Sequence, residues 1–308
     1  MSGRACVGCG KKGAALLFVS PDINYRTDGR EFEVFKCPHC GLVSLPAPPE
    51  DLAKYYGDHY APPKAGAGAA LALAKSVGRF AKVNRNPLPL IACSPGKRKI
   101  LEVGCGNGIL LALIARMNPD ADATGIEMRG NAARQAKARG LDVREGDFFE
   151  VAKKLRSGQY DLIVLNHSFE HLPRPKKALT EFRRLLRKGG EVALVVPNAE
   201  GASCTTFGKW AEPFDVPRHL FGFTGKSISG MAWKAGFTAS VKTFSEGSYI
   251  PASAMNRLGI ERKKYYTWRE RKAFNFAWIA GELCLSWAML VPDALGLGDQ
   301  LFVRLKKE

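Results

Sequence analysis

The sequence predicts an α/β protein built on a doubly wound, mostly parallel sheet, with a small cysteine-rich module in front of it. Three observations lead to this fold class. From residue 99 onward short apolar runs alternate with helical patterns, a glycine-rich turn follows the first run, and two Cys-x-x-Cys pairs lie near the N-terminus. Alternating strand and helix patterns are typical of sheets that carry helices on both faces.

Length and composition indicate a globular chain. The 308 residues are enough for one large domain and a small one, and 46% of them are hydrophobic. Lysine and arginine exceed the acidic residues by 46 − 29 = 17, which favours anionic partners such as nucleic acid, phosphorylated metabolites or lipid headgroups. The N-terminus MSGRACVGCG lacks the apolar core of a signal peptide, so we expect a cytoplasmic protein.

Changes in composition divide the chain into three parts. Residues 1–48 hold the cysteine pairs, and residues 49–98 form a linker and a helical lead-in that begins with the Pro-rich LPAPPEDL. Residues 99–308 form the large domain. Within it, residues 246–297 are predicted to be a helical insertion before the last strand, because the gap is far longer than a normal hairpin loop.

The elements of the large domain follow in order. Its strands are predicted at KILEV, ATGIE, LDVRE, YDLIVLN, EVALVVP, TASVKTFS and DQLFVRLKK, and its helices at ILLALIARM, NAARQAKARG, KKALTEFRRLLRKGG and KSISGMAWKAG. The nearly all-apolar runs fit strands that are buried on both faces. Gly189 and Gly190 are expected to end the third helix, and the segment from 198 to about 225 to be irregular.

The turn after the first strand is the first candidate binding site. Gly104, Gly106 and Gly108 allow a sharp turn and let a ligand approach the backbone, and the following helix presents its N–H groups. Phosphate-binding dinucleotide sites use a similar turn. Glu102, however, disfavours a phosphate and suits a cationic or amine-bearing ligand.

Polar residues after the next three strands extend this site. Glu127 ends the second strand, where a carboxylate can accept hydrogen bonds from both hydroxyls of a ribose. After the third strand, Asp147 can accept from an adenine amino group and Phe148 can pack near the ring. Asn166 closes the fourth strand at the same carboxyl edge.

These stretches, with HSFEHL and DVPRHLFGFT, resemble the class I S-adenosylmethionine-dependent methyltransferases, and within them the small-molecule branch of ubiquinone-biosynthesis O-methyltransferase-like proteins. The resemblance covers roughly residues 99–245. It implies a Rossmann-like seven-stranded sheet with an antiparallel last strand, and S-adenosyl-L-methionine as the cofactor. Base-methylating enzymes of this fold share an Asn/Asp-Pro-Pro-aromatic motif after the fourth strand, and this chain has Asn166-His167-Ser168-Phe169 there.

Methylation of a hydroxyl needs a base or an orienting group matched to the working pH, and histidine fits that role. His219 in the DVPRHLFGFT segment is the first candidate, and His171 in NHSFEHL is the second. His171 could equally cap or pack beneath the next helix. Arg218 could bind an acceptor carboxylate or phosphate, or have only a surface role.

The cysteine pairs predict a zinc ribbon. Cys6 and Cys9 form one Cys-x-x-Cys pair, Cys37 and Cys40 the other, and 27 residues separate the pairs. Four thiolates complete a closed tetrahedral shell, so the metal should be structural Zn²⁺, with a redox pair as the alternative. The lead-in CPHCGLVSLPAPP with its tyrosines resembles that of zinc-ribbon methyltransferases.

By that resemblance Tyr56 and Tyr60 close over the cofactor; otherwise they pack the linker. The insertion contains an apolar run, 273–291, that follows a basic, aromatic segment. Glu282 at its centre is costly in lipid. A buried helix, a lid or a dimer surface is therefore favoured over peripheral membrane contact.

Three functions remain open at this point. The favoured one is a methyltransferase with a small-molecule acceptor such as a sugar, a nucleotide-linked sugar, a quinone-like compound or a natural product, methylated on oxygen. The alternative is a zinc-ribbon RNA methyltransferase that uses the excess positive charge to bind the RNA backbone. A non-enzymatic binding module is the third, and the complete set of cofactor residues argues against it.

Overall fold

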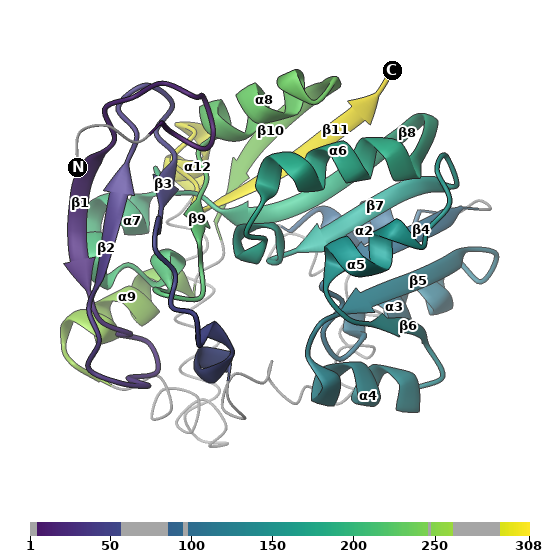
Figure 1. The fold of residues 1–308 in the computed structure, drawn as a ribbon, viewed down its shortest axis with the longest axis horizontal. Coiled ribbons are helices and arrows are strands. Elements are labelled where there is room, and N and C mark those ends of the chain that lie inside the picture. Colours follow the sequence, from purple (N-terminus) through teal and green to yellow (C-terminus); the bar gives the residue numbers. More distant parts are fainter. Residues whose placement is uncertain (1–4, 57–85, 95–97, 246–247, 261–289) are drawn as a thin grey trace. The chain divides into compact units, whose positions relative to one another are not determined.

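The structure is a computed structural model that describes residues 5–56, 86–94, 98–245, 248–260 and 290–308 (Figure 1). The chain divides into two compact units. Unit 1 comprises residues 1–60, 197–228 and 242–301, and unit 2 comprises residues 61–196, 229–241 and 302–308.

Unit 2 carries most of a seven-stranded sheet in the order β10-β11-β8-β7-β4-β5-β6. The strands are β4 (Lys99–Val103), β5 (Asp122–Glu127), β6 (Asp142–Glu145), β7 (Tyr160–Asn166), β8 (Leu186–Pro197), β10 (Phe237–Phe244) and β11 (Gln300–Lys307). Strands β4 to β8 pair in parallel. The predicted α/β fold class is therefore confirmed.

The last strand runs antiparallel to β8, as the resemblance implied. The backbone N–H of Asn198, just after β8, donates to the carbonyl of Asp299, just before β11. At the other end Lys307 Nζ donates to the carbonyl of Leu186. The start of each strand thus lies beside the end of the other, which only an antiparallel pair allows.

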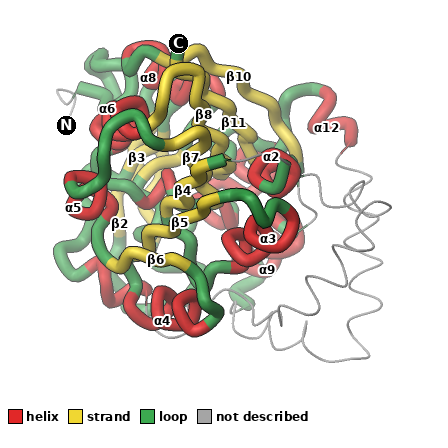
Figure 2. The backbone as a smooth tube through the Cα atoms, turned by 90° about the vertical axis from the view of Figure 1, so that its right-hand side faces the viewer, coloured by secondary structure: helices red, strands yellow, loops and turns green. Residues whose placement is uncertain are grey.

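Helices cover both faces of this sheet. They are α2 (Leu88–Ala92), α3 (Ile109–Met117), α4 (Gly130–Ala138), α5 (Phe148–Lys153), α6 (Pro175–Leu185) and α8 (Gly225–Lys234), and the short η2 (Phe169–His171) follows β7. Figure 2 shows α5 and α6 on one side of the strands and α2 and α3 on the other. In α6, Ala178, Leu179, Phe182 and Leu185 are fully buried, which is the 3.6-residue spacing of one helix face.

The end of α6 differs from the prediction. The helix stops at Leu185, and Gly189 and Gly190 belong to β8. Gly189 has φ of +74°, a conformation that glycine tolerates. The β7–β8 register passes from Tyr160↔Leu186 to Leu162↔Glu191, so the glycines serve a bulge at the start of the strand and do not cap the helix.

Unit 1 contains a second sheet, in the order β1-β2-β3-β9. Its strands are β1 (Ala15–Ser20), β2 (Phe32–Lys36), β3 (Val43–Ser44) and β9 (Phe221–Gly222). The fourth strand comes from the segment after β8, which the sequence pattern presented as irregular. That segment also forms α7 (Ala202–Phe207) and the 3-10 turns η3 (Gly208–Trp210) and η4 (Glu212–Phe214).

The rest of unit 1 consists of η1 (Leu52–Tyr56), α9 (Tyr249–Arg257) and α12 (Leu290–Ala294). Among the helices that the structure describes, none combines the length and the apolar character needed to cross a membrane. The predicted lead-in helix within 62–98 and most of the 273–291 run lie outside the described residues. The domain boundaries 1–48, 49–98 and 99–308 stay a prediction.

Candidate functional site

The glycine-rich turn joins β4 to α3 in unit 2. Gly104, Gly106 and Gly108 have φ of +76°, +56° and +80°. A Cβ on Gly104 would lie 2.5 Å from Ser168 Cβ, and one on Gly108 would lie 2.4 Å from Leu141 Cδ1. A Cβ on Gly106 would meet only Arg129 Nη2, at 4.0 Å. Two glycines therefore serve close packing, and Gly106 is the one that faces open space.

Glu127 binds back onto this turn. Its Oε2 accepts the backbone N–H of Gly106 at 2.7 Å. Its Oε1 accepts from the backbone N–H of Arg129 at 2.9 Å and from Arg129 Nε at 3.2 Å. A carboxylate has about four acceptor positions, so these three bonds orient Glu127 at the carboxyl end of β5 and leave it capacity for a ligand.

Glu102 is the second carboxylate at this edge. It is 3% exposed, and its Oε2 has no hydrogen-bond partner among the described residues. Burial, and then the charge of Glu127, raise the pKa of Glu102 well above its usual range. Two buried carboxyl groups with one unsatisfied oxygen make a site that a cation would stabilise.

Asp147 and Phe148 begin α5. Asp147 is the N-cap residue, and its Oδ1 accepts from the backbone N–H groups of Phe149 and Glu150 at 2.8 and 3.3 Å. Phe148 is buried, with its ring centroid 5.2 Å from those of Phe149 and Phe182. Both residues thus also have a local structural role.

Asn166 is exposed at the end of β7 and accepts, through Oδ1, a hydrogen bond from Asn86 Nδ2 at 3.4 Å. Asn86 precedes α2, so the described end of the lead-in lies at the carboxyl edge of the sheet. Ser168 is buried after β7, and its hydroxyl donates to the carbonyl of Val103 at 2.6 Å. This bond ties the β7 loop to the glycine turn.

Two residues beside Glu127 escaped the sequence analysis. Met128 directly follows β5, and its large apolar side chain is 62% exposed. Arg129 approaches the glycine turn and binds Glu127. The only sequence signal for either was its place within two residues of the acid that ends the strand.

The four predicted metal ligands come together in unit 1. The sulfur atoms of Cys6, Cys9, Cys37 and Cys40 all lie within 4.8 Å of one another. Cys6 and Cys40 are 3.6 Å apart and Cys9 and Cys37 3.7 Å apart. A tetrahedral zinc site with Zn–S bonds of about 2.3 Å has S···S distances of about 3.8 Å. The cluster therefore has the size of a Zn²⁺ site.

The cysteine cluster is bonded to the segment that contains His219. The carbonyl of Cys40 accepts the hydroxyl of Thr224 at 2.8 Å. The backbone N–H of Leu45 donates to the carbonyl of Leu220 at 3.0 Å, and β3 pairs with β9 between these contacts. The cysteine-rich module and residues 220–224 are thus parts of one structure.

Arg218 lies at the centre of unit 1 and is fully buried. Its guanidinium makes two hydrogen bonds to Asp22 (2.6 and 3.0 Å), two to Asp215 (2.7 and 3.0 Å) and one to the carbonyl of Tyr55 (3.3 Å). The charge of Asp215 and the bonds to both carboxylates outweigh burial and raise its pKa. Arg218 is therefore a buried structural clamp. This role differs from both that the sequence suggested, acceptor binding and a surface role.

The two candidate bases lie in different units. His171 ends η2 in unit 2 and is half-buried. His219 lies in unit 1, where its Nδ1 is 2.7 Å from the carbonyl of Pro213 and its Nε2 is 4.0 Å from Asp215 Oδ2. A carbonyl only accepts, so Nδ1 carries a proton and Nε2 is the basic nitrogen when the ring is neutral.

Tyr56 lies at the end of η1, and its hydroxyl donates to the carbonyl of Arg218 at 3.3 Å. This contact supports a packing role within unit 1. Tyr60 lies outside the described residues.

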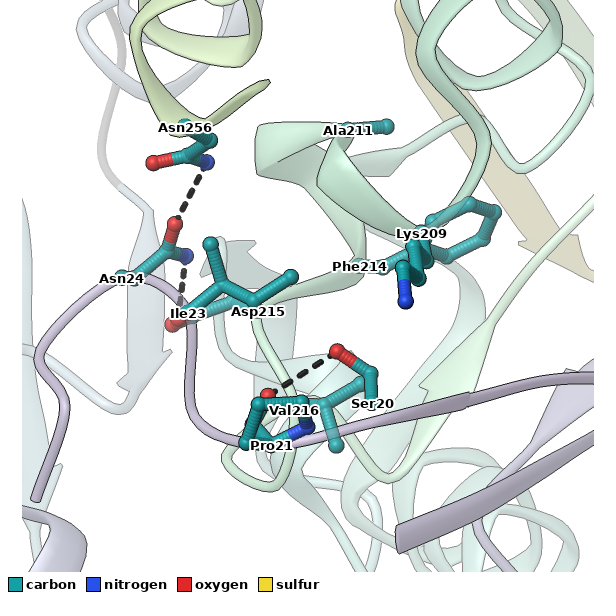
Figure 3. Close-up of a pocket in the computed structure, with 10 residues that line it drawn as sticks. All are labelled: Ser20, Pro21, Ile23, Asn24, Lys209, Ala211, Phe214, Asp215, Val216 and Asn256. Carbon is teal, nitrogen blue, oxygen red and sulfur yellow. Dashed lines mark hydrogen bonds between the residues drawn. The ribbon is translucent and has the colours of Figure 1, made fainter. Parts of the chain in front are cut away.

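A small pocket in unit 1 adjoins the Arg218 clamp (Figure 3). On one side, Asn256 Nδ2 donates to Asn24 Oδ1 at 2.8 Å, and Asn24 Nδ2 donates to Asp215 Oδ1 at 2.5 Å. Pro21, Phe214 and Val216 contribute apolar atoms. These two side-chain hydrogen bonds link α9 to the loop between β1 and β2, and that loop to Asp215.

Comparison with known proteins shows which family the chain resembles. Residues 70–240, more than half of the chain, match the methyltransferase domain family. Ubiquinone biosynthesis O-methyltransferase from Escherichia coli is 34% identical over 139 residues, which cover 41% of this chain and 56% of that protein. The same protein from Escherichia fergusonii matches to the same extent. The chain thus spans little more than half the length of these relatives.

Among solved structures, a SAM-dependent methyltransferase from Archaeoglobus fulgidus superposes with a TM-score of 0.50 at 16% identity, covering 74% of this chain and 97% of that one. At this identity the likeness concerns the fold. The extent of the family match decides the assignment: this chain belongs to the methyltransferase domain family.

Proposed function

We propose that the chain is an S-adenosylmethionine-dependent methyltransferase that methylates an oxygen atom of a small-molecule acceptor. The observation that carries the cofactor assignment is the pair of buried carboxyl groups at the glycine turn, with Glu102 Oε2 unpaired among the described residues. A cationic ligand would compensate this charge, whereas a phosphate would be repelled.

The residues at the carboxyl edge fit the parts of this cofactor. Glu102 would hold the amino-acid end, Glu127 the ribose hydroxyls and Asp147 the adenine amino group, with Phe148 and Met128 beside the ring. Gly106 would let the ligand approach the backbone, and Asn166 at the end of β7 would also contact the cofactor. When bound, S-adenosylmethionine supplies a methyl group that its sulfonium already activates.

The chain then has to place the acceptor in line and exclude water. His219 is the proposed base, because its Nδ1 is held by a carbonyl and its Nε2 is the proton-accepting atom. His171 is the second candidate. Of the two tyrosines, Tyr60 stays the proposed cofactor contact, and Tyr56 is assigned the packing role that its bond to the carbonyl of Arg218 supports.

Oxygen as the target is supported by the ubiquinone biosynthesis O-methyltransferases among the relatives. The acceptor class is a sugar, a nucleotide-linked sugar, a quinone-like compound or a natural product. Zinc bound by Cys6, Cys9, Cys37 and Cys40 is proposed to be structural, since four thiolates leave no open coordination position.

Cofactor binding can be tested by calorimetry with S-adenosylmethionine. We expect Glu127→Ala to weaken binding at least 30-fold, on the order of the 2 kcal/mol lost with a charge-assisted hydrogen bond. Glu191→Ala on β8, whose carboxylate binds Arg304, is the matched control and should bind like the wild type. Equal affinities of Glu127→Ala and wild type would overturn the assignment.

The acceptor class can be tested with methyl-labelled S-adenosylmethionine and a cell extract that is then separated into small-molecule, lipid and RNA fractions. Label in small molecules or lipid-linked glycans, lost in His219→Gln while cofactor binding persists, supports the proposal. Label mainly in RNA would overturn it in favour of the RNA methyltransferase, for which the net charge of +17 is the supporting observation.

A further inference from the structure

A strongly basic surface covers the outer side of α5 and α6 in unit 2. Between residues 148 and 190 nine lysine and arginine side chains are exposed, whereas Glu150 is the one exposed carboxylate. The cations are Lys153, Lys154, Arg156, Arg174, Lys176, Lys177, Arg183, Arg187 and Lys188. We call this set the basic surface.

The basic surface is continuous because side chains join its elements. Arg184 on α6 donates to the carbonyls of Ala152 and Leu155 at 2.7 and 3.0 Å, which closes the end of α5 against α6. The Arg174 guanidinium lies 4.4 Å from the centre of the Phe149 ring on α5. The two helices also lie side by side in Figure 1.

Local structure accounts for only part of this charge. Lys153 pairs with Glu150, and Arg187 pairs with Asp161. Cations in the last turn of a helix also complement its dipole. Arg156 and Lys188 lie beyond the helix ends, and with Lys154 they make no ion pair within the described part of the chain.

Most of the basic surface lies away from the cofactor edge. Residues 154–159 lead into β7 and residues 186–190 begin β8, where Tyr160 pairs with Leu186. Because β7 and β8 are parallel, both segments lie at the amino edge of the sheet. Glu127 and Asn166 end their strands at the carboxyl edge. A polyanion held by the amino edge is therefore not presented to the methyl group.

The chemistry of the surface favours lipid headgroups over nucleic acid. Single-stranded nucleic acids are held largely by stacking on aromatic rings, and Phe148, Phe149, Phe169 and Phe182 are all buried. A substrate RNA would in addition have to reach the carboxyl edge. An extended anionic surface needs only clustered cations, each contributing about 1 kcal/mol, or a factor of about five.

We propose that the basic surface docks this protein on anionic phospholipid membranes, with the cofactor edge turned away from the bilayer. This goes beyond the proposed methyl transfer and does not depend on it. The contact is electrostatic, since no large apolar side chain is exposed between residues 148 and 190.

The test is sedimentation of the full chain with vesicles of phosphatidylcholine, with and without 30% phosphatidylglycerol as a probe. At 0.1 M salt we expect the protein to bind the vesicles with phosphatidylglycerol and not those without it. At 0.5 M salt it should be released from them, because screening is strong. The variant Lys154→Gln/Arg156→Gln/Lys188→Gln should bind about 100-fold more weakly, as three factors of about five imply.

A matched control separates the surface from net charge. Arg116→Gln/Arg134→Gln/Arg139→Gln removes the same charge from three exposed positions: Arg116 on α3, Arg134 on α4 and Arg139 directly after α4. This variant should lose much less binding. Unchanged melting temperatures establish that both variants fold. Equal losses in the two variants, or no binding of the wild type at 0.1 M salt, would overturn the proposal. The proposal would also be overturned if the Lys154→Gln/Arg156→Gln/Lys188→Gln variant lost binding to a model RNA duplex while its vesicle binding stayed unchanged.

Discussion

Replacing Arg218 by methionine tests whether the buried clamp holds unit 1 together. The guanidinium lies between Asp22 and Asp215, and the two side chains are 0% and 5% exposed. Without the cation two buried carboxylates face each other with no compensating charge. Breaking a buried ion pair by removing one partner costs about 3–5 kcal/mol, and here five hydrogen bonds are lost with it.

Hydrogen exchange can measure this loss of stability at amides close to the clamp in unit 1. The amide of His219 donates to the carbonyl of Asp215, and the amide of Leu45 donates to that of Leu220. A cost of 3–5 kcal/mol lowers their protection by roughly 10² to 10³ or more if they exchange through opening of unit 1. Amides of β7 in unit 2 serve as the internal reference.

A compensating variant makes the reasoning refutable. Arg218→Met with Asp22→Asn and Asp215→Asn removes the uncompensated charges and should regain more than half of the lost protection. Asparagine is chosen at 215 because that residue has φ of +29°, which asparagine tolerates. Asp51→Asn, at the exposed Arg30–Asp51 pair, should change nothing measurable. If Arg218→Met is as protected as wild type, or if the triple variant is worse than the single one, the clamp does not act as described.

Three further predictions concern the site and the metal. Because the pKa of Glu102 is raised above that of the unfolded chain, its contribution to stability is full below about pH 4.5 and is lost as pH rises toward the folded pKa. Glu102→Gln should therefore raise the melting temperature at pH 8 relative to wild type while weakening S-adenosylmethionine binding; an unchanged pH dependence would contradict this. Gly106→Ala should weaken cofactor binding more than Gly140→Ala, which has φ of +79° and the same open surroundings for a Cβ, and equal affinities would speak against ligand approach at Gly106. Metal analysis should find one zinc per chain, lost in Cys37→Ser and retained in Cys93→Ser; a zinc-free wild type that still folds would rule out the metal.

The centre of the sheet could be predicted because β4 and β7 are apolar and almost wholly buried, which leaves little choice of structure. YDLIVLN and KILEV coincide with β7 and β4 to the residue. The cysteine spacing likewise predicted a cluster that the structure assembles. Local pattern was sufficient wherever contacts lie close in sequence or the burial is complete.

The remainder depends on long-range contacts that leave no local pattern. β9 has two residues, and it is a strand only because β3 lies beside it. The clamp joins Asp22 to Arg218, 196 positions apart, and nothing near either residue signals that pairing. Gly189 follows a helical sequence pattern, so the sequence could not show that it belongs to a bulge at the start of a strand.

The order of synthesis gives β9 one more consequence. All four cysteines have left the ribosome long before residue 221 appears, so the thiol cluster can capture metal while the edge of β3 still lacks its neighbour. An uncovered strand edge invites pairing with other chains. Fragments that stop before Phe221 should consequently bind zinc and yet aggregate, and grafting the N-terminal sixty residues onto another protein would move the metal site without the strand that completes its sheet.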